Sequence, residues 1–289
     1  MKRRLLLQGA AASVALGHAA LVRAQGSAPR LVSLSGGMTE VVYRLGAESL
    51  LVGTDTTSTY PAAALQTPKV GYMRQLSAEG VLALRPTALL ATNEAGPARV
   101  LDQLKGAGLA LHLVQADHSF EELRAKVRVV AQASGRVEAG KALEADLQTQ
   151  WQAALRKVAQ ADQQRRSQGH AERKVLFVMA HGGRPQGAGT DTAAHAMMTF
   201  AGARNVLSGG SGYQALTAEA VAQAAPDIIL TTQDSVDASG GLQRFWQFPG
   251  LAFTPAGRQQ RVVALDAMAL LGFGPRLPQT LDDLRQRLA

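Results

Sequence analysis

Two kinds of hydrophobic pattern alternate along the chain. Short runs of consecutive apolar residues are separated by segments in which apolar positions recur every three or four residues. The first pattern is typical of buried β-strands and the second of amphipathic helices. We expect strands at residues 31–34, 50–53, 88–92, 111–114, 174–179, 227–232 and 261–265, and helices at 39–45, 98–104 and 119–133. This alternation predicts an α/β fold with central parallel sheets.

The middle of the chain has a different pattern. From residue 137 to about 164 there is no proline and no glycine after Gly140, and apolar side chains recur at steps of four and three (Leu143, Leu147, Trp151, Leu155, Val158). The pattern predicts one long amphipathic helix of roughly 35 to 40 Å. It is either an ordinary crossover helix or a strut between two lobes. We favour the strut, with an N-terminal lobe at 25–135, a linking helix at 136–165 and a C-terminal lobe at 166–289.

An internal repeat favours the two-lobe interpretation. Residues 75–92 (QLSAEGVLALRPTALLAT) and 215–232 (ALTAEAVAQAAPDIILTT) are identical at seven of 18 positions, at a constant offset of 140. A Gly-Tyr pair precedes each segment, at Gly71-Tyr72 and Gly212-Tyr213. Each segment reads as a loop, a short helix, a proline turn and a buried strand. Two equivalent lobes would place equivalent loops on either side of one ligand cleft.

The N-terminus has the pattern of an export signal. Residues 2–4 are basic (Lys-Arg-Arg), residues 5–21 are mostly apolar and small, and Val22-Arg23-Ala24 supplies a small-x-small cleavage site. We therefore expect residues 1–24 to be a cleavable signal peptide. It fits export through either the general secretory route or the twin-arginine route. The mature protein is then expected in the periplasm, as a monomer.

Charge and cysteine content exclude several classes of protein. The chain has 30 basic and 22 acidic residues, and four of the basic residues lie in the signal, so the mature chain carries 26 − 22 = +4. This charge is too small to indicate a nucleic-acid partner. The chain has no cysteine, which excludes disulfides, thiolate metal sites, cysteine nucleophiles and a lipid anchor on cysteine.

Five segments resemble a known family. They are TEVVYRLGA (39–47), VGYMRQLSAEGVLALRPT (70–87), KVLFVMAHGG (174–183), DTAAHAMMTFAG (191–202) and LLGFGPRLPQTL (270–281). Together they resemble the periplasmic haem-binding proteins of bacterial haem ABC importers, in the helical-backbone class of substrate-binding proteins. The resemblance implies two α/β lobes joined by one long helix, b-type haem as the transported ligand, and a dimeric inner-membrane permease with its ATPase as the partner. It implies a binding protein and not an enzyme.

The resemblance also implies how haem iron is held. Tyr72 matches the family's axial ligand, and phenolate is a hard anion that suits ferric iron. A free tyrosine phenol ionises near pH 10, so its anion needs support. Arg74, two residues on, matches the family's hydrogen-bonding partner of that tyrosine. His181 follows a predicted strand, and in some relatives the corresponding histidine is a second axial ligand.

Other residues are weaker candidates. For the cleft they are Tyr60, Tyr213, His195, Arg184 and Arg276, of which the two arginines could bind haem propionates. The repeat places Tyr213 opposite Tyr72. Glu79 and Glu219 are equivalent in the repeat, and the resemblance implies that they dock on the permease.

Three other functions are open alternatives. A ferric siderophore or cobalamin carrier would share the same architecture. An exported hydrolase is disfavoured because the chain has no Gly-x-Ser-x-Gly and no His-Glu-x-x-His motif. A zinc or manganese carrier would need several converging histidines and carboxylates, and among the histidines only His181 has a plausible place at the end of a predicted strand.

The signal yields a direct prediction. The exported protein should begin near Gln25, because cleavage after Ala24 fits the small-x-small pattern. N-terminal sequencing of protein from the periplasmic fraction checks this. An intact Met1 on protein from the cytoplasm would contradict it.

Overall fold

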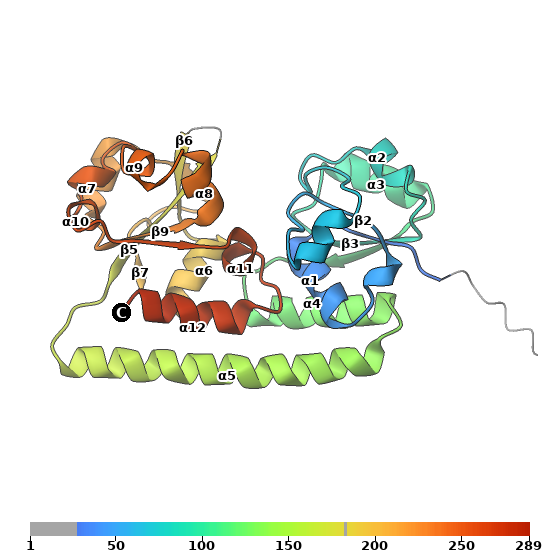
Figure 1. Cartoon of the computed structure of the whole chain (residues 1–289), viewed down its shortest axis with the longest axis horizontal. Coiled ribbons are helices and arrows are strands. Elements are labelled where there is room, and N and C mark those ends of the chain that lie inside the picture. The colour runs from blue at the N-terminus through green and yellow to red at the C-terminus, as the bar shows by residue number, and fades with distance from the viewer. Residues whose placement is uncertain (1–27, 182–183) are drawn as a thin grey trace, which may run out of the picture.

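The molecule consists of two lobes that lie side by side on one long helix (Figure 1). The structure is a computed structural model, and it describes residues 28–181 and 184–289. The predicted signal peptide therefore lies outside the described residues. We call the parts before and after the long helix the N-terminal and C-terminal lobes.

The N-terminal lobe is built on a four-stranded parallel sheet in the order β2-β1-β3-β4. The strands are β1 (Leu31–Ser33), β2 (Leu51–Thr54), β3 (Ala88–Thr92) and β4 (Ala110–Val114). The helices are α1 (Gly36–Arg44), α2 (Ala78–Leu82), α3 (Ala98–Gly106) and α4 (Phe120–Ala133), with short 3-10 turns at Glu48–Leu50 and Ala62–Gln66. β3 is buried along its whole length, as expected for a continuous apolar run in a parallel sheet.

The C-terminal lobe contains a mixed sheet in the order β10-β9-β5-β6-β8, with β7 also paired to β5. Its strands are β5 (Lys174–His181), β6 (Arg184–Ala188), β7 (Arg204–Asn205), β8 (Tyr213–Ala215), β9 (Ile228–Thr232) and β10 (Val262–Leu265). The parallel part, β10-β9-β5, matches the predicted strands. The antiparallel part, β5-β6-β8, was not predicted. The sequence of β6, RPQGA, contains proline and glycine, which weaken a strand pattern.

Helices cover the C-terminal sheet and end the chain. They are α6 (Ala193–Phe200), α7 (Ala218–Ala224), α8 (Gln233–Ala238), α9 (Leu242–Phe245), α10 (Pro255–Arg258), α11 (Ala267–Leu271) and α12 (Leu277–Arg287), with a 3-10 turn at Leu251–Phe253. The two repeat units form the same kinds of element at equivalent positions. α2 and α7 begin at Ala78 and Ala218, and β3 and β9 end at Thr92 and Thr232, in both cases 140 residues apart.

The long helix, α5 (Val137–Ser167), supports both lobes. Its 31 residues give a length of about 46 Å. Trp151, near its middle, stacks on Phe120 at 5.1 Å and meets the edge of Phe200 at 5.0 Å, between ring centroids. One core cluster therefore runs from α4 of the N-terminal lobe across α5 into the C-terminal lobe. This arrangement confirms the predicted fold class of two α/β lobes joined by one helix.

A second connection between the lobes lies above α5. The segment between α11 and α12 passes against the N-terminal lobe, where Lys126 of α4 donates hydrogen bonds to the carbonyl oxygens of Gly272 at 2.9 Å and Phe273 at 3.3 Å. Lys126 also pairs with Glu122 at 2.5 Å, and both side chains are almost completely buried. The backbone of α1 at Gly37 also lies very close to the backbone of this segment at Gly272. Glycine is needed at position 37, because a Cβ there would lie 2.3 Å from the carbonyl oxygen of Gly272.

Arg276, at the start of α12, extends this connection. Its guanidinium binds both carboxylate oxygens of Glu40 in α1, at 3.0 and 2.6 Å, and also pairs with Asp266 at 3.0 Å. It lies 4.0 Å from the ring centroid of Tyr60. Burial raises the pKa of Glu40 and Arg276 opposes that rise, with a net upward shift. The pair thus joins α1 to the C-terminal helix.

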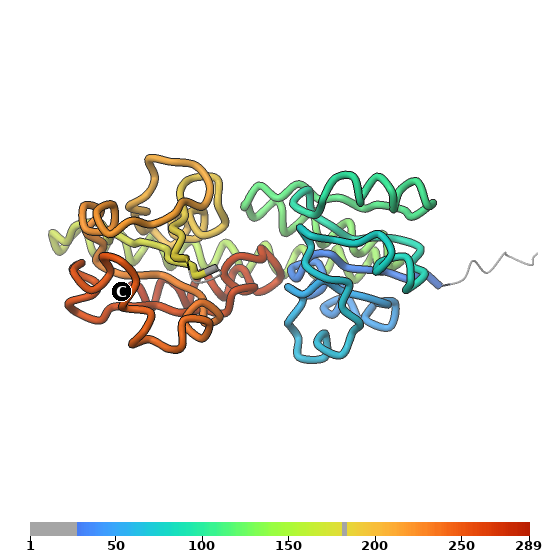
Figure 2. The backbone as a smooth tube through the Cα atoms, turned by 90° about the horizontal axis from the view of Figure 1, so that it is seen from above, coloured from blue at the N-terminus to red at the C-terminus, as the bar shows by residue number. Residues whose placement is uncertain are grey.

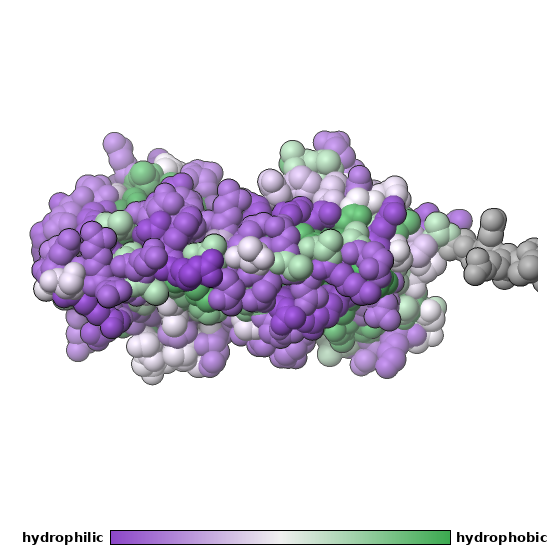
Figure 3. All heavy atoms as spheres, turned by 90° about the horizontal axis from the view of Figure 1, so that it is seen from below, coloured by the Kyte–Doolittle hydropathy of each residue, from purple (hydrophilic) through white to green (hydrophobic). Residues whose placement is uncertain are grey.

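The surface on the side of α5 is mostly hydrophilic, with scattered apolar patches (Figure 3). Seen from the opposite side, the two lobes follow one another along the long axis and α5 runs behind both (Figure 2). Among the described residues, no helix combines the length and the apolar character that a bilayer crossing requires.

The buried ion pair generates a stability prediction. Lys126→Met should lower the free energy of unfolding by about 3–5 kcal/mol, because it leaves Glu122 buried without its partner charge. The double variant Glu122→Gln, Lys126→Met should be more stable than the single variant. Urea unfolding curves of the three proteins measure this. A single variant as stable as wild type would contradict the described role of Lys126.

Candidate functional site: the cleft between the lobes

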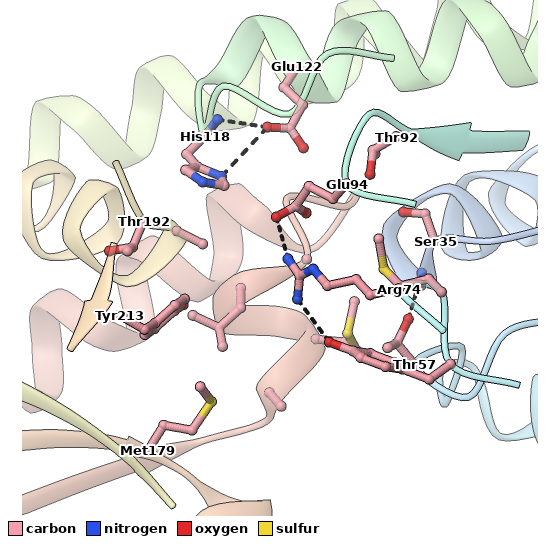
Figure 4. A pocket seen from close by; sticks show the side chains of 18 of the residues that line it. Ser35, Thr57, Arg74, Thr92, Glu94, His118, Glu122, Met179, Thr192 and Tyr213 are labelled. Atoms are coloured by element: carbon pink, nitrogen blue, oxygen red, sulfur yellow. Dashed lines mark hydrogen bonds and ion pairs between the residues drawn. The ribbon is translucent and has the colours of Figure 1, made fainter. Parts of the chain in front are cut away.

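A cavity of about 350 Å³ lies between the two lobes (Figure 4). Most of its polar lining comes from loops that follow the strands, which is where α/β folds usually meet ligands. The lining includes Ser35, Thr57, Tyr72, Arg74, Thr92, Glu94 and His118 from the N-terminal lobe, and Met179, Thr192, Tyr213, Met268 and Leu271 from the C-terminal lobe. The cleft is therefore polar and charged on one wall and more apolar on the other.

Tyr72 and Arg74 meet inside this cleft. The Arg74 guanidinium donates a hydrogen bond from Nη1 to the Tyr72 hydroxyl at 2.8 Å. The loop that carries them turns at Gly71, whose φ of +100° is disfavoured for residues with a side chain. A backbone hydrogen bond from the Gln75 N–H to the Tyr72 carbonyl, 2.8 Å long, closes the next turn. The local backbone thus brings the two predicted side chains together.

Glu94 completes a three-residue group. It lies two residues beyond β3 and accepts a hydrogen bond from Nη2 of Arg74, with which it forms an ion pair (Figure 4). Burial lowers the pKa of Arg74, but the charge of Glu94 and the hydrogen bond to Tyr72 outweigh that effect and raise it above the ordinary value. Arg74 is therefore a permanent cation. Sequence analysis did not single out Glu94, although its place just after a predicted strand was a usable signal.

Tyr213 lies on the opposite wall and faces Arg74 and Glu94 across the pocket (Figure 4). Its ring lies 6.3 Å from that of Phe177, between centroids. The Tyr213 hydroxyl is partly desolvated, which disfavours its anion and raises the pKa of Tyr213 to about 12. The negative charge of Glu94 adds to this rise, and the positive charge of Arg74 opposes it. Tyr213 is therefore a neutral phenol near neutral pH.

A third polar group lines the cleft where β4 leads into α4. The Ser119 hydroxyl accepts a hydrogen bond from the Glu122 N–H at 3.1 Å, as a helix cap. The Glu122 carboxylate accepts from the His118 N–H at 2.8 Å and pairs with Lys126. The His118 ring packs against Phe273 of the other lobe at 5.6 Å. The sequence analysis missed His118, because nothing in its spacing distinguishes it from a surface histidine.

The remaining histidine and arginine candidates have different surroundings. His181 is the last residue of β5 and pairs with Arg184 across β5 and β6, but its side chain lies outside the described part of the structure. Arg184 is exposed. His195 is the third residue of α6, and its Nδ1 lies 3.1 Å from the Asn205 amide nitrogen. Neither Arg184 nor His195 belongs to the described lining of the cleft.

Tyr60 and Arg276 also lie away from the described lining of the cleft. They contact one another at the connection between the lobes, where Glu40 and Asp266 neutralise the Arg276 charge. Both residues were weak cleft candidates, and their observed contacts are structural. The sequence analysis did not anticipate the ion pair of Arg276 with Glu40 because the two residues lie 236 positions apart in the sequence.

Glu79 and Glu219 lie in the first turns of α2 and α7, and both are exposed. α2 and α7 lie at the ends of the two lobes that face away from α5 (Figure 1). The two carboxylates therefore lie on one side of the molecule, one on each lobe.

The chain matches a known family. The family described as periplasmic binding protein matches residues 31–269. The chain belongs to this family. As a periplasmic binding protein it is a substrate-binding protein and not an enzyme, in agreement with the prediction.

Two solved structures are especially similar to this periplasmic binding protein. The periplasmic heme-binding protein BhuT, in complex with two hemes, is 45% identical, with a TM-score of 0.82 over 90% of this chain and 97% of that chain. The periplasmic heme-binding protein RhuT from Roseiflexus sp. RS-1, in apo form, is 36% identical, with a TM-score of 0.83 over 90% and 98%. These similarities confirm the resemblance inferred from the five sequence segments.

Curated relatives of this periplasmic binding protein include carriers of another ligand. The vitamin B12-binding protein of Vibrio cholerae is 25% identical over 260 residues, which cover 90% of this chain and 87% of that protein. The family thus includes at least two ligand classes, and the cleft residues must distinguish them.

Within residues 28–181 and 184–289, no group of three or more histidines and carboxylates is arranged to hold a metal ion.

Proposed function

We propose that this protein captures haem in the cleft between its lobes and delivers it to an inner-membrane ABC permease for haem iron uptake. The observation that carries the proposal is the Tyr72 hydroxyl held by the Arg74 guanidinium inside that cleft. The similarity to two periplasmic heme-binding proteins over nine-tenths of the chain supports the same ligand. The proposed site of action is the periplasm, after removal of residues 1–24.

The proposed chemistry centres on one iron–oxygen bond. Ferric iron accepts the phenolate oxygen of Tyr72, and the phenol proton is lost to solvent as the bond forms. The adjacent Arg74 cation stabilises the anionic oxygen. His181 is proposed as a second or distal ligand, and Tyr213 as a side chain that contacts the porphyrin from the opposite wall. Met179, Met268 and Leu271 offer adaptable apolar contacts for the porphyrin.

The ligand assignment predicts a large effect of one hydroxyl group. Tyr72→Phe should weaken binding of ferric haem by roughly 100-fold or more, since even the outer partners of a metal ligand contribute roughly 10- to 100-fold. The tyrosinate charge-transfer band should disappear. Titration of purified protein with haemin, followed by visible absorbance, measures both.

Two further measurements sharpen this test. Tyr43→Phe removes a hydroxyl from α1 outside the described lining of the cleft and should bind haem like wild type. Titration with cyanocobalamin should give no saturable binding. If wild type bound cyanocobalamin and not haemin, the haem proposal would fail. If Tyr72→Phe kept the wild-type spectrum, the ligand assignment would fail and Tyr213 would become the ligand to test.

We further propose that Glu79 and Glu219 bind to the permease. They occupy equivalent places in the two repeat units and lie on the same side of the molecule. A two-fold repeat in the binding protein suits a dimeric permease, and exposed carboxylates suit docking on basic residues.

The docking proposal predicts that binding and uptake separate. The double variant Glu79→Ala, Glu219→Ala should bind haemin as wild type does but should support roughly tenfold slower uptake, because rim charges mainly affect association. Growth on haem as the iron source, together with uptake by vesicles that contain the permease, measures the effect. Glu138→Ala removes an exposed carboxylate from α5, on the other side of the molecule, and is the matched control. Normal uptake by the double variant would contradict the docking roles.

A further inference from the structure

Haem carries two carboxylate groups at one edge of its ring, and a cleft that binds haem needs hydrogen-bond donors for them. The two arginines expected to supply such donors, Arg184 and Arg276, do not belong to the described lining of the cleft. Within that lining, the side chains that contain nitrogen are Arg74, Lys126 and His118. A side-chain nitrogen donor for a carboxylate is therefore one of these three.

Two of the three side chains are already engaged. Arg74 donates hydrogen bonds to the Tyr72 hydroxyl and to the Glu94 carboxylate. Lys126 pairs with Glu122 and donates to two backbone carbonyls of the other lobe, which uses all three hydrogens of its ammonium group. The imidazole of the remaining residue is therefore the available nitrogen donor.

His118 is held in position by protein contacts. Its backbone N–H donates a hydrogen bond to the Glu122 carboxylate at 2.8 Å, and its ring packs against Phe273 of the other lobe at 5.6 Å between centroids. Its φ is +56°, in the left-handed region that few residues other than glycine adopt. Such residues persist where the surrounding structure fixes them, and they cluster at ligand sites. The ring is thus placed in advance, with 19% of the side chain accessible.

The ring nitrogens of His118 are free to donate to a ligand. Nδ1 lies 4.0 Å from Oε2 of Glu122, which is too far for a hydrogen bond. In the part of the chain that the structure describes, neither ring nitrogen forms a hydrogen bond. Because Lys126 balances the charge of Glu122, that carboxylate does not strongly repel an anionic group bound at the ring.

The position of His118 in the pocket favours contact with the edge of a ligand. His118 lies at one end of the pocket, beside Glu122, whereas Arg74 and Tyr213 extend from the two facing walls (Figure 4). A flat ligand between those walls would present its faces to the walls and its edge to His118. The iron of haem lies at the centre of the ring and the carboxylates lie at the edge. This position therefore suits a carboxylate better than the iron.

We propose that His118 donates a hydrogen bond from a ring N–H to a carboxylate at the edge of the haem, and that this contact helps the cleft to select its ligand. The inference rests on the proposed function. Hydrogen bonds to an ionised acceptor are stronger than those between neutral groups. The corrin ring of cobalamin carries neutral amides in place of the carboxylates, so the same imidazole would bind it less strongly. His118 thus favours a porphyrin with free carboxylates over cobalamin.

The carboxylate contact predicts a loss of affinity that depends on the ligand. His118→Phe keeps an aromatic ring against Phe273 and removes both ring nitrogens. It should bind haemin roughly tenfold more weakly than wild type, the usual size of a hydrogen bond to a charged group. Its affinity for haemin dimethyl ester should match that of wild type, because the esters carry no ionised carboxylate. Titrations of the purified proteins, followed by visible absorbance, measure both affinities.

Two more variants separate this effect from effects on folding. His118→Gly adopts a positive φ without strain and should show the same selective loss of haemin affinity. His170→Phe replaces an exposed histidine outside the described lining and should change neither affinity. Equal losses for haemin and its ester, or no loss for haemin, would assign His118 a purely structural role and overturn the proposal.

Metal-free protoporphyrin IX separates the inference from the proposed function. It has both carboxylates and no iron, so Tyr72→Phe should leave its affinity unchanged, while His118→Phe should lower it roughly tenfold. The fluorescence of the porphyrin measures its binding. An unchanged affinity of His118→Phe for protoporphyrin IX would overturn the inference. If wild type bound this porphyrin but not haemin, the proposed function would fail, and a loss of porphyrin affinity in His118→Phe would still establish the carboxylate contact.

Discussion

The arrangement of the two lobes depends on a lysine that is buried between them. Lys126 belongs to α4, yet two of its partners are backbone carbonyls of the segment between α11 and α12. A buried ammonium without such partners is strongly unfavourable, so separation of the lobes would require these bonds to be exchanged for water. The pair of Arg276 and Glu40 adds a second bond between the same elements. Together with the shared core along α5, these contacts fix the spacing of the lobes.

A fixed spacing means that the cleft is formed before a ligand arrives. The polar side chains that line the cleft are mostly carried by loops, but those loops are held at strand ends and by hydrogen bonds between side chains, as for Arg74 with its two partners. Binding then requires little ordering of the protein, which favours affinity. The N-terminal wall provides Arg74 and Glu94, and the C-terminal wall provides Tyr213, Met179 and Met268. The two faces of a flat ligand would therefore contact chemically different walls.

The hydrophobic spacing along α5 and the internal repeat were sufficient to predict the two lobes and the long helix. The meeting of Tyr72 with Arg74 was an expectation from the family resemblance, because a two-residue separation alone does not decide whether two side chains touch. The antiparallel strand β6 was missed because its proline and glycine hide the pattern, and β8 was missed because three residues are too few to show one. The structural place of Arg276 was missed because ion pairs between distant segments leave no periodic signal, and Glu40 looked like an ordinary residue of an amphipathic helix.

The position of the Lys126 partners has a consequence for how the protein is assembled. The carbonyls that satisfy this lysine belong to residues 146 and 147 positions later, close to the C-terminus. While the chain is being synthesised, the N-terminal lobe can form its parallel sheet but cannot bury its lysine. The last segment of the chain therefore completes the first lobe, because it supplies hydrogen bonds that this lobe cannot make for itself.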